Sequence, residues 1–352
     1  MDPLTHALSG ALLARATAAP RADPRALPVR RRVAAGLAAA AFPDADFALR
    51  LIDTITYLNW HQGITHSLVM LPVWALLFAH LFARLDPAHP RWRAYYGPAS
   101  LGLAIHIAGD LITAYGLMLF APLSTQRFSL PLAFVIDTQI TAIIVCGLLG
   151  AALLPRVGRA IGALALAALG GYVAFLALQQ RHALAVGEAY ASALGLPDVA
   201  IHALPQPPSP FNWKTIIAGG DTYHVANVGL DRRRQLWPPA SAIPWLRAIH
   251  SAYAAPHEVH WQRIARFGDG PAIATLAREA WSRPEFTPYR RFAVFPRFDG
   301  LSHDDGPSNP CAWFVDIRFE VPQVPPSFRF GMCRDGTGAW QMRRMRGAFW
   351  ID

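Results

Sequence analysis

The chain has 352 residues, of which 53% are hydrophobic and only 16% are charged, and its mean hydropathy is +0.24. The hydrophobic fraction and the mean hydropathy are high for a soluble protein, and the charged fraction is low. Together they indicate a membrane protein. The net charge of +9 comes almost entirely from arginine, because Lys214 is the only lysine. The arginines are scattered through loops without a basic stripe, so we expect no nucleic-acid partner.

Apolar segments near the roughly 20 residues that cross a bilayer are concentrated before residue 180. In chain order, the predicted spans are 3–19, 33–58, 68–85, 97–120, 132–154 and 160–179. The first is short and the second is interrupted. The prediction is therefore a membrane α-helical bundle of about five to six spans, some of them discontinuous. Residues 1–179 form this predicted transmembrane domain, which carries the polar site.

From residue 180 onward, Arg, Asp, Pro and Trp return at frequencies typical of soluble domains. Residues 215–218 and 222–227, joined by the turn-forming 219–221, read as a hairpin. Further strands are predicted at 291–296, 312–320, 327–334 and 339–346, and helices at 243–254 and 271–281. We predict a soluble α+β domain with an antiparallel sheet over residues 180–352.

Arginine in short loops favours the cytoplasmic side of a membrane. The arginine-rich loops are 20–32, 84–96 and 155–159, which are alternate loops of a six-span arrangement. The opposite loops, 53–67 and 121–131, contain only Arg127. The prediction is a multi-pass protein of the bacterial inner membrane whose domain 180–352 is periplasmic.

Cysteine usage follows from this topology, because the outer compartment is oxidising. Cys146 lies in a predicted span and is expected to be a free thiol. Cys311 and Cys333 both fall in the predicted outer domain, where two interpretations stay open: a disulfide, or two buried thiols.

Ionisable side chains occur within the apolar half of the chain. His6 follows Asp2 by four residues and Asp110 follows His106 by four, a spacing that puts both members of a pair on one helix face. Ionisable groups at membrane depth are costly and usually pair or bind a ligand. Two such pairs in one membrane domain favour ligands over packing residues.

Two further segments add polar groups. Pro43 interrupts an apolar run just before Asp44 and Asp46, so these carboxylates lie at a helix break or, alternatively, at a solvated loop end. In the run His61-Gln62-Gly63-Ile64-Thr65-His66-Ser67, the two imidazoles would point apart on a regular helix. They converge only through a turn, which Gly63 permits.

Residues 1–140 resemble the YdjM-type family of bacterial and archaeal integral-membrane proteins, described as metal-dependent hydrolases. The matching pieces are Asp2-Pro3-Leu4-Thr5-His6, Phe42-Pro43-Asp44-Ala45-Asp46, the run 61–67, His106-Ile107-Ala108-Gly109-Asp110, and 122–137. Gln62 departs from the family, which usually has arginine there. Two later pieces, 210–213 and 316–319, resemble an extracytoplasmic extension of some members.

The resemblance implies a divalent metal site and nearby catalytic groups. The implied metal ligands are Asp2, His6, Asp44, His61, His66, His106 and Asp110, and the implied catalytic residues are Asp46, Thr65, Arg127 and Asp137. Zinc is the first choice, with manganese or magnesium as alternatives, and so many ligands would serve up to two ions. Arg127 suits an anionic substrate, although an arginine that snorkels to lipid headgroups fits as well.

The leading hypothesis is a membrane-embedded, divalent-metal-dependent hydrolase acting on a lipid-linked ester or phosphoester at the periplasmic leaflet. Its partners would be the lipid bilayer and a lipid substrate. The alternative is a metal-binding membrane scaffold, stress-response or transport component whose outer domain binds a protein partner. Transporters usually contain internal repeats, and we find none in the sequence.

Overall fold

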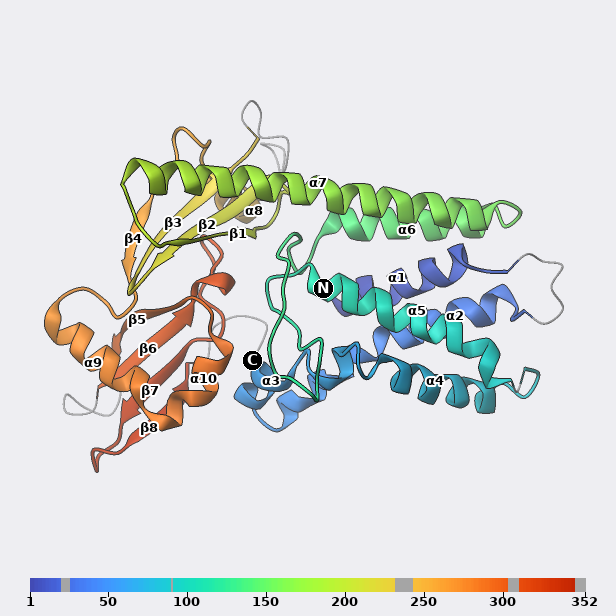
Figure 1. Cartoon of the computed structure of the whole chain (residues 1–352), viewed down its shortest axis with the longest axis horizontal. Coiled ribbons are helices and arrows are strands. Elements are labelled where there is room, and N and C mark those ends of the chain that lie inside the picture. The colour runs from blue at the N-terminus through green and yellow to red at the C-terminus, as the bar shows by residue number, and fades with distance from the viewer. Residues whose placement is uncertain (20–25, 90, 232–242, 303–309, 346–352) are drawn as a thin grey trace. The chain divides into compact units, whose positions relative to one another are not determined.

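The structure is a computed structural model and describes residues 1–19, 26–89, 91–231, 243–302 and 310–345 (Figure 1). The chain divides into two compact units, Met1–Leu178 and Gln179–Asp352. Part of the predicted cytoplasmic loop 20–32 and the last residue of the predicted strand 339–346 lie outside the described residues.

The first unit is helical. Its elements are α1 (Pro3–Ala16), α2 (Val29–Ala41), the 3₁₀ helix η1 (Pro43–Leu51), α3 (Thr54–Trp60), the 3₁₀ helix η2 (Ile64–His66), α4 (Leu71–Leu85), α5 (Trp92–Leu111), α6 (Thr138–Leu153) and the first part of α7 (Gly158–Ala193). The span 33–58, predicted to be interrupted, is divided among α2, η1 and α3, because Pro43 begins a new, tighter helix.

Close helix packing in this unit depends on glycine. A Cβ on Gly36 of α2 would lie 2.7 Å from the carbonyl oxygen of Gly10 in α1, and a Cβ on Gly102 of α5 would lie 2.5 Å from the carbonyl oxygen of Gly36. Small residues at helix crossings let backbones approach closely, as is common in membrane proteins. The contact brings α1 and α5 against α2, which fixes the helices that carry His6 and His106.

Membrane-length helices are fewer than the predicted spans. Among the described residues, Gly158–Ala193 is long and apolar enough to cross a bilayer. Thr54–His66 and Leu71–Leu85 meet the same test only as a pair, bent by 74°, and Thr138–Leu153 is apolar but shorter. The helical nature of this half is confirmed, whereas the number of spans stays a prediction.

The second unit contains two antiparallel sheets rather than one. The first comprises β1 (Ala200–Pro205), β2 (Asn212–Gly219), β3 (Thr222–Gly229) and β4 (Gln262–Ala265), and the second comprises β5 (Pro296–Ser302), β6 (Cys311–Asp316), β7 (Phe330–Arg334) and β8 (Trp340–Arg344), each in chain order. The helices are α8 (Pro244–His250), α9 (Pro271–Ser282), α10 (Thr287–Phe292), and the 3₁₀ turns η3 (Pro284–Phe286) and η4 (Ile317–Phe319).

The boundary between the sheets explains the main difference from prediction. The helices α9 and α10 separate β4 from β5, so the second set of strands begins a new sheet. In the segment predicted as strand 291–296, the first two residues are the end of α10, 293–295 are irregular, and β5 starts only at Pro296. The predicted hairpin is confirmed as β2 and β3, paired from Asn212 with Gly229 to Gly219 with Thr222.

Neighbouring strands of the second sheet carry the two outer cysteines. Cys311 of β6 lies directly opposite Cys333 of β7, and the two form a disulfide. Cys146 of α6 is a free thiol. The structure therefore selects the disulfide from the two interpretations of the sequence.

Candidate metal centre

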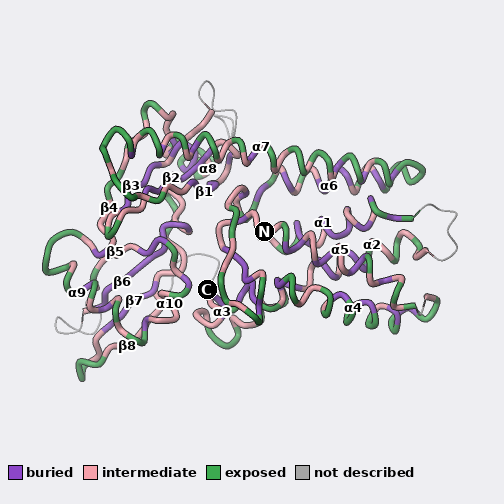
Figure 2. The backbone as a smooth tube through the Cα atoms, in the orientation of Figure 1, coloured by how far each residue is buried: buried purple, intermediate pink, exposed green. Residues whose placement is uncertain are grey.

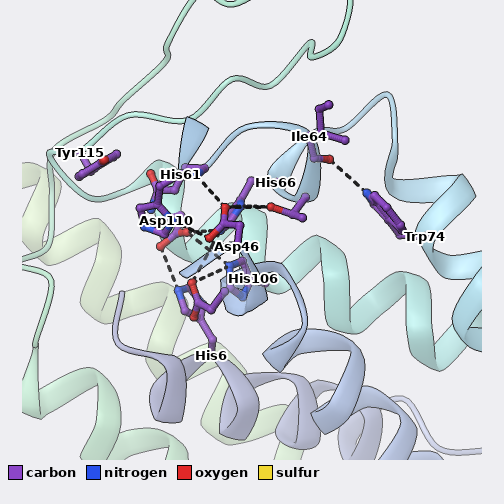
Figure 3. A network of polar contacts seen from close by, with 12 residues as sticks. His6, Asp46, His61, Ile64, His66, Trp74, His106, Asp110 and Tyr115 are labelled. Atoms are coloured by element: carbon purple, nitrogen blue, oxygen red, sulfur yellow. Dashed lines mark hydrogen bonds and ion pairs between the residues drawn. The ribbon is translucent and has the colours of Figure 1, made fainter. Parts of the chain in front are cut away.

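Four side chains from three segments of the first unit converge on one point, three of them labelled in Figure 3 as His66, His106 and Asp110. They are Asp44 of η1, His66 of η2, and His106 and Asp110 of α5. One ligand atom from each lies within 4.8 Å of all the others. His66, His106 and Asp110 are fully buried, and Asp44 is 10% exposed at its side chain. This group could bind a metal ion.

Local backbone features explain the convergence. The four-residue spacing on α5 puts His106 and Asp110 on the same face. Proline at the start of η1 restarts the chain in a 3₁₀ helix just before Asp44. The chain turns sharply after α3, where Gln62 adopts a left-handed φ of 58°, and η2 then directs His66 toward the group. These irregular segments lie where a buried polar site can satisfy their backbone.

Hydrogen bonds fix both imidazoles with their Nε2 atoms toward the centre. His106 Nδ1 lies 2.6 Å from the carbonyl oxygen of Ala40, an acceptor only, so Nδ1 carries the proton. Thr65 Oγ1 donates to Asp46 Oδ2 at 3.0 Å and therefore accepts from His66 Nδ1 at 2.9 Å. In both rings Nε2 keeps its lone pair for a ligand. This arrangement is typical of metal-binding histidines.

The carboxylates complete the donor set. Asp110 Oδ1 accepts from His6 Nε2 at 2.9 Å and from the amino group of Met1, which leaves Oδ2 facing the imidazoles. Asp110 Oδ2 lies 3.1 Å from His66 Nε2 and 3.4 Å from His106 Nε2. Asp44 Oδ1 lies 3.8 Å from each of the same nitrogens.

The residues fit a metal ion. His66 Nε2, His106 Nε2, Asp110 Oδ2 and Asp44 Oδ2 are buried and make no hydrogen bond of acceptable geometry within the described residues. Buried polar atoms without partners are costly and rare in folded proteins. Zinc bonds of about 2.0–2.2 Å place tetrahedral donors about 3.4 Å apart, close to the separations observed here. Two imidazoles and two carboxylates suit borderline divalent ions.

His61 and Asp46 lie beside this centre and bind each other. His61 Nδ1 is 2.7 Å from Asp46 Oδ1, and the backbone N–H of Gln62 donates to Asp46 Oδ2 at 3.0 Å. Asp46 thus holds both His61 and Thr65, and through Thr65 it orients His66. The structure places Asp46, Thr65 and His61 around the four ligand atoms rather than among them.

Other predicted site residues lie at different places. His6 stacks on His106 with ring centroids 3.7 Å apart and supports Asp110. Asp2 caps α1 by accepting from the N–H of Thr5. Asp137 caps α6 and also accepts from Tyr172 Oη at 3.1 Å. Both aspartates therefore use oxygens to satisfy helix N-termini.

Arg127 binds backbone carbonyl oxygens from separate segments of the chain. Its guanidinium donates to the carbonyl oxygens of Gly116, Leu58, Asn59 and His61, at distances of 2.6 to 3.2 Å. It also lies over the ring of Tyr115. These bonds hold the end of α3, where the chain turns toward His66. The contact of His106 with the carbonyl of Ala40 supports the site, and no side-chain pattern in the sequence could indicate it.

Comparison with known proteins supplies the family. No curated protein and no solved structure gives a significant match to the chain. The model of a family described as YdjM inner membrane protein matches residues 1–183, more than half of the 352 residues. The chain therefore belongs to the YdjM inner membrane protein family.

Proposed function

We propose that this protein is a membrane-embedded, divalent-metal-dependent hydrolase. The observation that carries the proposal is the set of four buried ligand atoms, from Asp44, His66, His106 and Asp110, that make no hydrogen bond within the described residues. A bound ion would supply Lewis-acid polarisation and a nucleophilic water at neutral pH. The chain itself contributes oriented ligands and their supporting hydrogen bonds.

The supporting residues have separate parts in this proposal. Asp46 and Thr65 keep His66 in the tautomer that binds the ion. Arg127 holds the turn after α3 in place through carbonyl oxygens. The described residues contain one set of four donors, so we propose one ion. Zinc fits the mixed nitrogen and oxygen donors best, with manganese as the alternative.

A lipid ester or phosphoester is the proposed substrate class. Large apolar side chains are exposed in the segments next to the ligands, among them Leu51, Ile52 and Trp60, with exposed fractions of 90%, 70% and 52%. Further exposed large apolar residues lie on α4 and α7, where Figure 2 shows exposed positions along both helices. Such patches mark contact with apolar partners, and trans-bilayer helices expose apolar side chains to lipid. We propose a multi-pass protein of the inner membrane.

The number of protein ligands favours an alternative, in which the metal ion is structural rather than catalytic. Structural zinc sites use four protein ligands, whereas catalytic sites use three and keep a position for water. The present group offers four. In this second proposal the ion locks η1, η2 and α5 together, and the protein acts as a membrane scaffold whose outer domain binds a partner. Asp44, the most exposed ligand, would have to yield to water in the catalytic proposal.

Metal analysis tests the shared part of both proposals. Protein purified without chelator and then supplied with zinc, manganese or magnesium should retain about one divalent ion per chain. His66→Ala and Asp110→Ala should lose it, while His80→Ala, which changes an exposed histidine of α4, should retain it. Metal-free wild-type protein would contradict the site.

A lipid screen separates the two proposals. The wild-type protein in labelled phospholipid vesicles should release a hydrolysis product, and a chelator should abolish that release. Asp44→Asn should reduce turnover more than metal content, because the exposed ligand is the one proposed to yield to water. Retained metal with no hydrolysis, together with loss of thermal stability on chelation, would support the scaffold.

A further inference from the structure

The only lysine of the chain lies in the second unit. Lys214 of β2 is 3% exposed, and its ammonium donates to the backbone carbonyl oxygens of Ile317 at 2.9 Å and of Glu320. An ammonium has three donors and no acceptor. Two donors are therefore used, and the described residues supply no acceptor for the third.

Among the residues that the structure describes, the charge of Lys214 has no ion-pair partner. Within the described part of the chain, no carboxylate oxygen lies within 4.0 Å of Nζ, although Arg297 nearby pairs with both Glu320 and Asp299. A buried charge is costly unless it is paired. Burial accordingly lowers the pKa of Lys214 to about 8, although Glu320 and Asp316 oppose that shift.

Lys214 lines a pocket of about 250 Å³. Asn227 lies directly opposite Lys214 on β3, and its Oδ1 is buried without a hydrogen-bond partner among the described residues. The remaining wall is mixed: Val225, Ile264 and Val324 are among its apolar residues, and Gln262 and the ion-paired Arg297 and Glu320 are its polar ones. At roughly 30 Å³ per water, the volume corresponds to about eight water-sized groups.

We propose that this pocket binds a small organic carboxylate that also carries an O–H or N–H donor. The carboxylate pairs with the ammonium of Lys214 and accepts its third N–H. The donor satisfies Asn227 Oδ1, and a short aliphatic group contacts the apolar residues of the wall. A neutral ligand would leave the buried charge unpaired, and a phosphate would leave these apolar residues without a partner. This inference is independent of hydrolysis at the metal centre.

The test uses the full chain in detergent micelles with carbon-13 at lysine Cε, which gives one protein signal because Lys214 is the only lysine. The probes are 2-hydroxy-3-methylbutanoate, isovalerate without the hydroxyl, and the hydroxy acid's methyl ester without the charge. The hydroxy acid should shift the signal to saturation and move its titration midpoint above about 8. Isovalerate should bind about three- to tenfold more weakly, because it lacks one hydrogen bond.

The variant Asn227→Ala tests whether the pocket recognises the ligand's hydroxyl, or whether Lys214 only joins β2 to the segment 317–320. In Asn227→Ala the two acids should bind with equal affinity, while the Lys214 signal still responds to both. A signal that responds to neither acid at tens of millimolar would overturn the proposal. So would an equal response to the methyl ester, because the charge of the ligand would then have no part in binding.

Discussion

At the scale of single residues, the candidate metal centre depends on the hydrogen bonds that orient each ligand side chain. The carbonyl of Ala40 fixes His106, Thr65 fixes His66, and His6 occupies the other oxygen of Asp110. Each contact leaves one atom directed at the centre. Such supporting contacts typically change metal affinity by about 10- to 100-fold when they are removed.

Thr65 provides the most specific test of this support. Thr65→Val keeps the shape of the side chain but removes the hydroxyl between Asp46 and His66, so His66 loses its fixed tautomer. We expect the Kd for zinc to rise about 10- to 100-fold, measured by competition with a chelating dye. Thr65→Ser should restore the wild-type value, and Thr141→Val, in α6, should have no effect. A wild-type Kd in Thr65→Val would show that this hydrogen bond does not orient the ligand.

Lys214 makes stability depend on pH in a defined direction. Its pKa is about 8 in the folded protein because of burial, against an ordinary value of 10.5. The unfolded chain therefore binds more protons between these values, so the free energy of unfolding rises with pH from about 8 to 10.5, and Lys214 adds no further pH dependence below about 8. Lys214→Met should remove this rise. Thermal unfolding of both proteins between pH 7 and 11 measures the difference, and parallel curves would contradict a depressed pKa.

At the scale of helices, the site depends on how closely α1, α2 and α5 pack. Backbone contact at Gly10, Gly36 and Gly102 leaves no room for side chains. Histidines on α1 and α5 stack at 3.7 Å as a result of that approach. Packing therefore sets the distance between elements that carry the site.

Two glycine substitutions of the same chemistry should have opposite effects. Gly36→Ala places a Cβ 2.7 Å from Ala14 Cβ and should destabilise the protein by about 1–3 kcal/mol through overpacking. Gly170→Ala, in α7, meets no atom within 4 Å and should stabilise it by about 0.5–1 kcal/mol through helix propensity. Thermal unfolding in detergent compares them. Equal effects would mean that the α1–α2 contact is not tight.

Much of this arrangement was predictable from periodic patterns. The i,i+4 spacing of His106 and Asp110, and the proline before Asp44, indicated a polar site at a helix break. The sequence could not indicate that His61 would turn to Asp46, because that depends on the left-handed backbone at Gln62. Likewise, an aspartate before a helix reads equally as a cap or a ligand, and the structure places Asp137 at a cap.

The sheets illustrate the same limit over longer distances. Alternating side chains and turn residues predicted the strands of the hairpin, because those signals are local. The division of the eight strands of the described residues into two sheets depends on pairing between segments that α9 and α10 separate in the chain. A local sequence pattern does not indicate which existing strand a later strand will pair with. Strand existence was therefore more predictable than sheet membership.

At the scale of the whole molecule, two features concern the compartment of the second unit. The Cys311–Cys333 disulfide is of the kind that persists in oxidising compartments. The arginine-rich loops 84–96 and 155–159 favour the cytoplasm for the ends opposite the polar site. Both support the proposal that residues 180–352 are periplasmic.

Reporter fusions test this topology directly. Alkaline phosphatase needs an oxidising compartment to fold, so a fusion after Asp352 should be active and a fusion after Pro87, in an arginine-rich loop, should be silent. A reporter that fluoresces only in the cytoplasm should give the reverse pattern. As an internal control, Cys311→Ser with Cys333→Ser should leave both results unchanged, because topology follows from loop charge and not from the disulfide. Phosphatase activity after Pro87 with none after Asp352 would invert the orientation, placing the second unit in the cytoplasm, where such a disulfide is not expected to persist.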